Sequence, residues 1–108
     1  MMKKTIKLKK CKKLKDVFSQ SKGLMFSKKV AIPLIFVFKK NTKFAFHSLF
    51  CPKFDIIFLN GNKEVVNYEA VDCVKRIVPK ESYRYVVEVP FGFIKKNKIR
   101  KKTQIEFD

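Results

Sequence analysis

The stretch FDIIFLNGNKEVV, residues 54–66, decides the fold of this chain. β-favouring residues run over positions 55–59 and resume over 64–68, on either side of Asn60-Gly61-Asn62. An Asn-Gly pair accepts the positive φ angles that a tight turn between two strands requires. The stretch therefore predicts a β-hairpin.

Short β-favouring runs of the same kind lie on both sides of this hairpin. They predict strands at residues 34–39, 44–50, 71–77, 83–89 and 103–107. Helix is expected only at residues 17–21, which Asp16 can cap, and as one turn within 92–98. The 108 residues are 46% hydrophobic, which excludes a disordered chain and leaves room for one modest core. We expect a mainly β fold, a small antiparallel barrel or sandwich forming a single domain over residues 1–108.

Basic residues dominate the charged side chains. There are 26 lysine and arginine residues against 9 acidic ones, a formal net charge of +17. Residues 1–15 are rich in lysine, yet Ile6 and Leu8 alternate with lysines, as in a half-buried edge strand. If this segment lies beside the C-terminal one, the two would form a single patch for nucleic acid or another anionic partner. The patch would comprise Lys9, Lys10, Lys12, Lys13, Lys95, Lys96, Lys98, Arg100, Lys101 and Lys102.

The type of basic residue weakens this interpretation. Only Arg76, Arg84 and Arg100 are arginines, and bidentate recognition of phosphates or guanines prefers arginine. A solvated basic surface with no partner explains the same composition. The composition therefore allows nucleic-acid binding without requiring it.

The cysteines and the hydrophobic runs indicate a cytoplasmic protein. Cys11, Cys51 and Cys73 are odd in number and form no CxxC pair, which favours reduced thiols. The longest mostly apolar run, residues 30–38, is far shorter than the ~20 residues that a membrane helix needs. No apolar signal-peptide segment follows the lysine-rich start. We expect no membrane span.

His47, Cys51 and Asp55 recur every fourth residue within FAFHSLFCPKFDIIF, residues 44–58. On a strand they share one face, opposite a wall of phenylalanines, but they stand about 13 Å apart, too far to share a metal ion. A zinc site would need Cys11 or Cys73 to fold into place as further ligands. We expect no metal and no cofactor. Asp55 is expected to accept backbone N–H bonds and to pin the bend after Pro52.

Two further residues complete a candidate functional face. Glu88 shares a strand face with Arg84, which predicts an ion pair on the sheet surface. It would matter to His47 only if their strands were neighbours. Met25 could line a ligand groove or fill a gap. The candidate face is therefore His47, Asp55, Met25 and Glu88, and no catalytic residue is assigned.

Three motifs resemble a known family. They are Gly23-Leu24-Met25-Phe26 before an apolar strand, the stretch at residues 54–66, and YVVEVPFGFIKKNKI at residues 85–99. Their order resembles the bacterial and archaeal family catalogued as domain of unknown function 192, over about residues 17–107. A Trp-Met-Lys-Asn-Thr segment of the bacterial members is replaced here by residues 46–50, FHSLF, which looks closer to an archaeal variant. Arg100-Lys101-Lys102 stands where the family has a late Gly-Asp. The resemblance implies a mainly β fold and no established reaction.

Three hypotheses for function follow. The first is a non-enzymatic binding or accessory module, and the second is a nucleic-acid-binding domain that uses the lysine patch, with Phe or Tyr faces available for base stacking. The third is a metal-dependent or Cys/His enzyme centred on His47, Asp55 and a cysteine. The sequence has no P-loop, Rossmann glycine pattern, HExxH or GxSxG motif, so the common enzyme signatures give the third no support. No oligomeric state is indicated.

Overall fold

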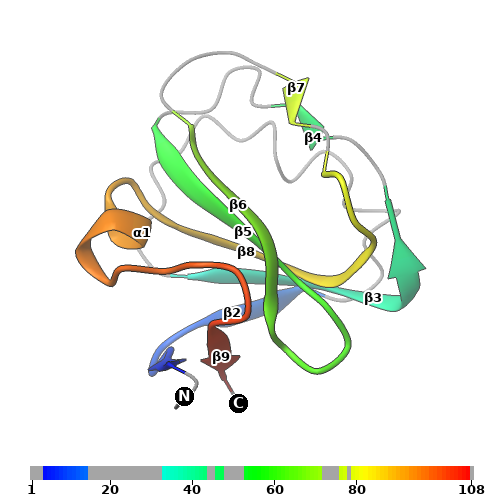
Figure 1. The fold of residues 1–108 in the computed structure, drawn as a ribbon, viewed down its shortest axis with the longest axis horizontal. Coiled ribbons are helices and arrows are strands. Elements are labelled where there is room, and N and C mark those ends of the chain that lie inside the picture. The colour runs from blue at the N-terminus through cyan, green and yellow to red at the C-terminus, as the bar shows by residue number, and fades with distance from the viewer. Residues whose placement is uncertain are drawn as a thin grey trace.

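The structure is a computed structural model that describes residues 4–14, 33–43, 46–47, 53–71, 76–77 and 79–107. Its main element is a five-stranded sheet in the order β2-β3-β8-β5-β6 (Figure 1). The strands are β2 (Lys12–Leu14), β3 (Leu34–Thr42), β8 (Tyr83–Pro90), β5 (Phe54–Leu59) and β6 (Val65–Val71). The four from β3 to β6 are antiparallel to their neighbours, whereas β2 joins β3 in parallel.

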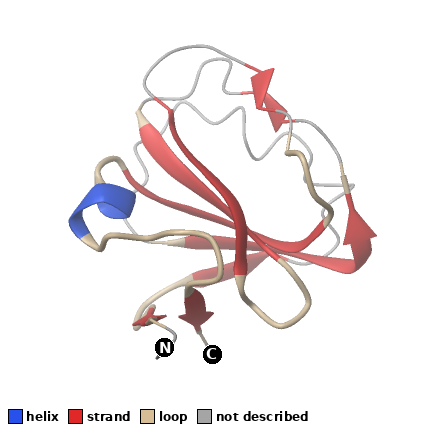
Figure 2. Cartoon of the chain, in the orientation of Figure 1, coloured by secondary structure: helices blue, strands red, loops and turns tan. Residues whose placement is uncertain are grey.

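Two small sheets and one helical turn complete the described fold. Strand β1 (Thr5–Lys7) pairs in parallel with β9 (Gln104–Glu106), and β4 (Phe46–His47) pairs antiparallel with β7 (Arg76–Ile77). Helix α1 (Phe93–Lys96) is the one helix of the described residues (Figure 2). The predicted mainly β fold is thus confirmed. The sequence pattern did not predict that both N-terminal strands pair in parallel.

The predicted hairpin joins β5 to β6, but its turn is built differently from the prediction. Asn60 Oδ1 accepts hydrogen bonds from the backbone N–H of Asn62, at 2.9 Å, and of Glu64, at 3.0 Å. The positive φ angle falls on Lys63, at 62°, and not on Gly61. The side chain of Asn60 therefore organises the turn, and the conformational role expected of Gly61 was wrong.

Both faces of the large sheet are buried, because side chains alternate between faces along each strand. On one face Phe36, Phe54, Ile56, Phe58 and Val86 form a first core with Tyr83 and Ile77. On the other face a second core contains Ile35, Ile57, Leu59, Val65, Val87 and Val89, together with Leu8, Ile99 and Ile105 from the terminal segments. The phenylalanine wall is confirmed for Phe54 and Phe58, but the opposite face of β5 is a core as well.

The two ends of the chain meet at one edge of the molecule. Figure 1 shows the N-terminal strand and β9 side by side, below the large sheet. Ile6 and Ile105 are partners in this short ladder, and Ile105 is fully buried. The terminal strands are thereby fixed to the second core.

Several predicted elements lie outside the described residues. They are the helix at residues 17–21, the turn with Gly23 and Met25, and the segment with Cys51 and Pro52. No helix among the residues that the structure describes is long and apolar enough to cross a membrane.

Candidate functional site

A groove of about 630 Å³ lies where the two terminal strands meet the β5–β6 turn. We call it the terminal groove. Its lining combines three lysines with one acidic, one amide and two apolar side chains. The residues are Lys7, Leu8, Lys9, Lys63, Gln104, Glu106 and Phe107.

Backbone pairing brings these residues together from three parts of the chain. Lys7 is the ladder partner of Glu106, and the N–H of Leu8 donates to the carbonyl oxygen of Glu106 at 2.8 Å. The N–H of Ile105 donates to the carbonyl oxygen of Lys63 at 2.9 Å, which ties β9 to the hairpin turn. Leu8 is buried in the second core and anchors the groove floor. The groove is thus fixed to the sheet by hydrogen bonds and packing.

Phe107 of the groove lining contacts two ammonium groups, one from Lys63 of the lining and one from Lys13 outside it. The Nζ of Lys63 lies 4.2 Å from the ring centroid of Phe107, and the Nζ of Lys13 lies 5.7 Å from it. Tyr85 meets Phe107 edge to face, with ring centroids 5.4 Å apart. Each cation–π contact is worth on the order of 0.5–1 kcal/mol at an exposed site. The rings therefore concentrate positive charge beside the groove.

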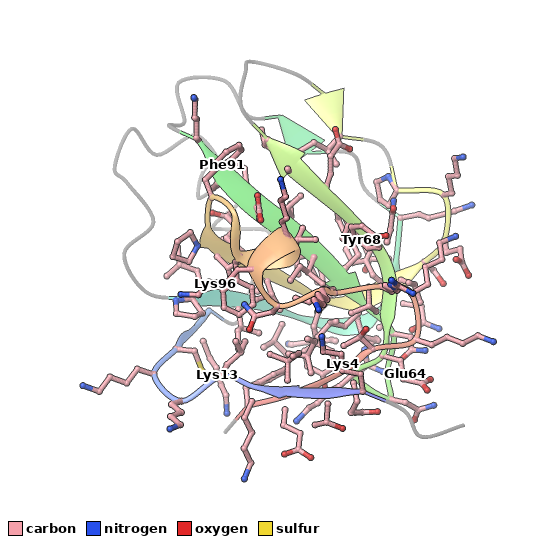
Figure 3. The ribbon with its side chains drawn as sticks, turned by 60° about the vertical axis from the view of Figure 1, so that its left-hand side comes forward. Lys4, Lys13, Glu64, Tyr68, Phe91 and Lys96 are labelled. Atoms are coloured by element: carbon pink, nitrogen blue, oxygen red, sulfur yellow. The ribbon has the colours of Figure 1, made fainter. Side chains whose placement is uncertain are left out.

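The C-terminal half of the predicted lysine patch lies at the other end of the β1–β9 ladder. The Nζ of Lys4 donates to the carbonyl oxygens of Asn97 and Lys98, so the two terminal segments do touch. In Figure 3 Lys4 and Lys13 lie on the N-terminal segment, and Lys96 lies on helix α1. Lys9, Lys10 and Lys13 are exposed, as are all six basic residues of the second cluster, Lys95, Lys96, Lys98, Arg100, Lys101 and Lys102. The side chain of Lys12 is outside the description.

Asp55 is buried, with 1% of its surface exposed, and it fixes the start of helix α1. Its Oδ2 accepts hydrogen bonds from the backbone N–H of Gly92, at 3.1 Å, and of Ile94, at 2.8 Å. The prediction that Asp55 accepts backbone hydrogen bonds is therefore confirmed. The donors belong to the turn after β8, so Asp55 fixes that turn, whereas the bend at Cys51 and Pro52 lies outside the described residues.

Glu88 is also buried, and its Oε2 lacks a hydrogen-bond partner among the described residues, as does Oδ1 of Asp55. It is 4% exposed and lies between its cross-strand neighbours Leu34 and Ile56. Burial raises the pKa of Glu88 from its ordinary value of 4.5 to about 8. The predicted surface ion pair with Arg84 is wrong, because Glu88 lies inside the first core. Arg84 instead donates its Nε to the carbonyl oxygen of Phe38 at 3.1 Å.

The described members of the predicted functional face do not converge. Asp55 pairs with Val89, and Ile56 pairs with Glu88, so the two carboxyl groups lie on opposite faces of the sheet. The strand of His47 pairs with β7, whereas β8 pairs with β3 and β5, so His47 and Glu88 are not on neighbouring strands. Met25 lies outside the described residues. In the described part of the chain no three His, Cys, Asp or Glu side chains are grouped to hold a metal.

Several groove residues were missed by sequence reasoning. In the sequence Lys63 follows a turn motif and belongs to the predicted hairpin. Gln104, Glu106 and Phe107 belong to the predicted last strand. No local signal marks them, because they become a site only when β9 pairs with β1 at the opposite end of the chain.

Solved structures of two other proteins share this fold. One, from Sinorhizobium meliloti, is described as a putative transcription regulator, and it matches 85% of this chain and 76% of its own with a TM-score of 0.73 at 18% identity. The other, of unknown function, is from Novosphingobium aromaticivorans and matches 85% of this chain and 70% of its own, with a TM-score of 0.73 at 21% identity. At these identities the likeness concerns the fold alone.

Curated relatives and a family model agree with the motifs. The UPF0127 protein PF1050 of Pyrococcus furiosus is 43% identical over 75 residues, 67% of this chain and 64% of that protein. The UPF0127 protein TK1120 of Thermococcus kodakarensis is 31% identical over 87 residues, 77% of this chain and 55% of that protein. The chain spans less than two thirds of the length of these relatives. The family model DUF192, described as Uncharacterized ACR, COG1430, matches residues 3–107. This match covers nearly the whole chain, and the protein therefore belongs to the DUF192 family.

Proposed function

We propose that this protein is a non-enzymatic binding module that contacts nucleic acid through the terminal groove. The observation that carries the proposal is the concentration of Lys7, Lys9 and Lys63 around one groove, beside an aromatic ring that holds ammonium groups. Lysine neutralises a phosphate as a point charge, and each neutralised phosphate releases counterions into solution. A polyanion is therefore the partner class that this surface suits.

The choice of lysine indicates what kind of contact is made. Arg84 is engaged with a backbone carbonyl, and the side chain of Arg76 is not described, so Arg100 is the arginine available on the described surface. Because the groove lining has lysines and no arginine, we expect it to attract phosphates by charge and not through paired, bidentate hydrogen bonds. We expect strong salt dependence and affinity for the backbone of many sequences.

A cytoplasmic location is part of this proposal. Cys11 is unpaired and half-buried, as expected for a reduced thiol in the cytoplasm. The solved neighbour described as a putative transcription regulator is consistent with a nucleic-acid partner. That description belongs to another protein with 18% identity, so the proposal depends on the lysines.

Salt-dependent binding tests the proposal. A labelled single strand of about twelve nucleotides is titrated with the protein by fluorescence anisotropy at roughly 50 and 200 mM salt. The triple variant Lys7→Gln, Lys9→Gln, Lys63→Gln should bind more weakly. The slope of log affinity against log salt should fall by about 2, because each single-strand phosphate contact contributes about 0.7.

A matched control separates the groove from net charge. The triple variant Lys40→Gln, Lys43→Gln, Lys80→Gln removes the same charge from exposed positions outside the groove lining. It should keep most of the salt slope. Equal losses of affinity and salt slope in the two triple variants would show that the nucleic acid is attracted by net charge and not by the groove. Absence of binding by the unsubstituted protein at low salt would refute the proposal.

A further inference from the structure

The terminal groove contains two groups that a phosphate site does not need. Glu106 is exposed and lines the groove opposite Lys7, its ladder partner. A carboxylate at this place repels phosphate and lowers affinity for a plain polyanion such as polyphosphate. Its position in the groove calls for a ligand that carries hydrogen-bond donors as well as phosphates.

Gln104 adds a second acceptor to the same wall. Its Nε2 donates to the carbonyl oxygen of Asn62 at 2.7 Å, which fixes the amide plane and leaves the side-chain oxygen as an acceptor. Gln104 and Glu106 are two residues apart on β9, so their side chains leave the same face of that strand. The groove wall thus offers acceptors, while its lysines offer positive charge.

Phe107 supplies the third property, an apolar surface. It is half-buried and lines the groove next to Glu106. The ammonium groups of Lys63 and Lys13 lie over its ring. We therefore expect Phe107 to position these lysines and to make apolar contact with the ligand, and not to stack on a base. Stacking of the kind expected from the sequence is therefore not needed for recognition here.

We infer that the groove takes a single-stranded nucleic acid and selects bases that carry an exocyclic amino group, with Glu106 and Gln104 as the acceptors. This inference rests on the proposed function. Phosphates would lie against the three lysines, and the amino group of cytosine, adenine or guanine would donate to Glu106. Uracil presents a carbonyl oxygen at the position where cytosine has its amino group, and that oxygen would face the carboxylate unfavourably. In a duplex these amino groups are paired, so a single strand is the form that can enter a recessed groove.

Two RNA homopolymers test the inference, because their bases differ only at position 4, an amino group in cytosine and a carbonyl oxygen in uracil, and at the adjacent N3, an acceptor in cytosine and an N–H donor in uracil. Oligo(C) and oligo(U) of about twelve nucleotides carry the same charge and the same ring size. The unsubstituted protein should bind oligo(C) roughly tenfold more tightly, the lower end of what one good base contact provides. Glu106→Gln should bring the two affinities close together and should raise affinity for polyphosphate, because a repulsive charge is removed.

Glu81→Gln is the matched control for charge. Glu81 is exposed and lies near Lys101, at 3.9 Å, outside the groove lining, so its removal should leave the preference for oligo(C) unchanged. Glu106→Ala serves as a second variant, and the melting temperature of each variant reports whether it folds.

The outcomes separate this inference from the proposed function. Equal affinity for oligo(C) and oligo(U), with binding still lost in the groove-lysine variant, overturns the base selection and leaves the nucleic-acid module standing. A duplex that binds more tightly than oligo(C), or a preference that Glu106→Gln leaves intact, also overturns it. Absence of binding to every polyanion removes both.

Discussion

Among the described residues, each face of the large sheet buries one carboxyl group, and the two groups differ in their hydrogen bonding. On the face of the second core, Asp55 receives two backbone N–H groups from the turn that begins helix α1. On the face of the first core, Glu88 lies between Leu34 and Ile56. One oxygen of each carboxyl group, Asp55 Oδ1 and Glu88 Oε2, has no hydrogen-bond partner among the described residues, so the contrast lies in the two hydrogen bonds that Asp55 Oδ2 accepts. Both residues are nearly inaccessible to solvent, at 1% and 4% exposed.

The difference shows what a buried acid needs. Hydrogen bonds from backbone amides compensate for the water that a carboxylate loses, so Asp55 can hold a turn in place. Glu88 has no such compensation described, and burial keeps it protonated at pH values where an exposed glutamate is ionised. One face of the sheet therefore has a structural anchor, and the other has a residue whose charge depends on pH.

The largest expected effect comes from the pH dependence of Glu88. Below its ordinary pKa of 4.5 Glu88 is protonated in the folded and the unfolded state, so its ionisation does not lower the free energy of unfolding. As pH rises toward its folded pKa of about 8, the unfolded state loses the proton first, and the free energy of unfolding falls. Above that pH the loss approaches about 5 kcal/mol. Glu88→Gln, neutral at every pH, should abolish this decline in urea unfolding followed from acid to alkaline pH.

Glu81→Gln is the comparison for that experiment, because it removes an exposed carboxylate. The free energy of unfolding of this variant should change with pH in the same way as that of the unsubstituted protein. If the same holds for Glu88→Gln, Glu88 is ionised in the folded protein and the contrast between the two faces disappears.

Removal of Asp55 should have the next largest effect. Asp55→Ala leaves the N–H groups of Gly92 and Ile94 without their acceptor and should lower the free energy of unfolding by about 3–4 kcal/mol. Asp55→Asn keeps an acceptor oxygen without the charge and should cost about half as much. Chemical denaturation at neutral pH measures both. Equal losses in the two variants would show that the negative charge, and not the acceptor oxygen alone, holds the turn.

The smallest expected effect concerns the ring at the edge of the second core. Phe107→Leu removes the contact with Tyr85 and the cation–π contacts with Lys63 and Lys13, and should lower the free energy of unfolding by about 1 kcal/mol. Phe91 is 46% exposed and has one such contact, with Lys53 at 5.6 Å, so Phe91→Leu should cost less. Thermal unfolding compares the two. A larger loss from Phe91→Leu would show that the ring cluster at the groove adds little to the second core.

Much of the central sheet was predictable because its signals are local. The β-favouring residues along 54–59 and 83–90 and the turn at Asn60 are properties of adjacent residues, and they predicted strands β5, β6 and β8 close to their observed places. The roles of single residues were less predictable. Asp55 was correctly expected to accept backbone hydrogen bonds, yet its donors lie 37 and 39 residues away, beyond any local pattern.

The sequence by itself determined the class of fold, the family and the basic character of the chain. These follow from residue periodicity, from motifs in a fixed order and from composition, none of which requires knowledge of distant contacts. Tertiary structure alone decided that the face opposite the phenylalanine wall is also a core, which buries Glu88 and Asp55 on opposite sides. It also decided that Thr5 pairs with Gln104, and so created the terminal groove. Strand pairing over such a separation is selected by burial of Leu8 and Ile105 in the second core, and a local pattern does not encode that choice.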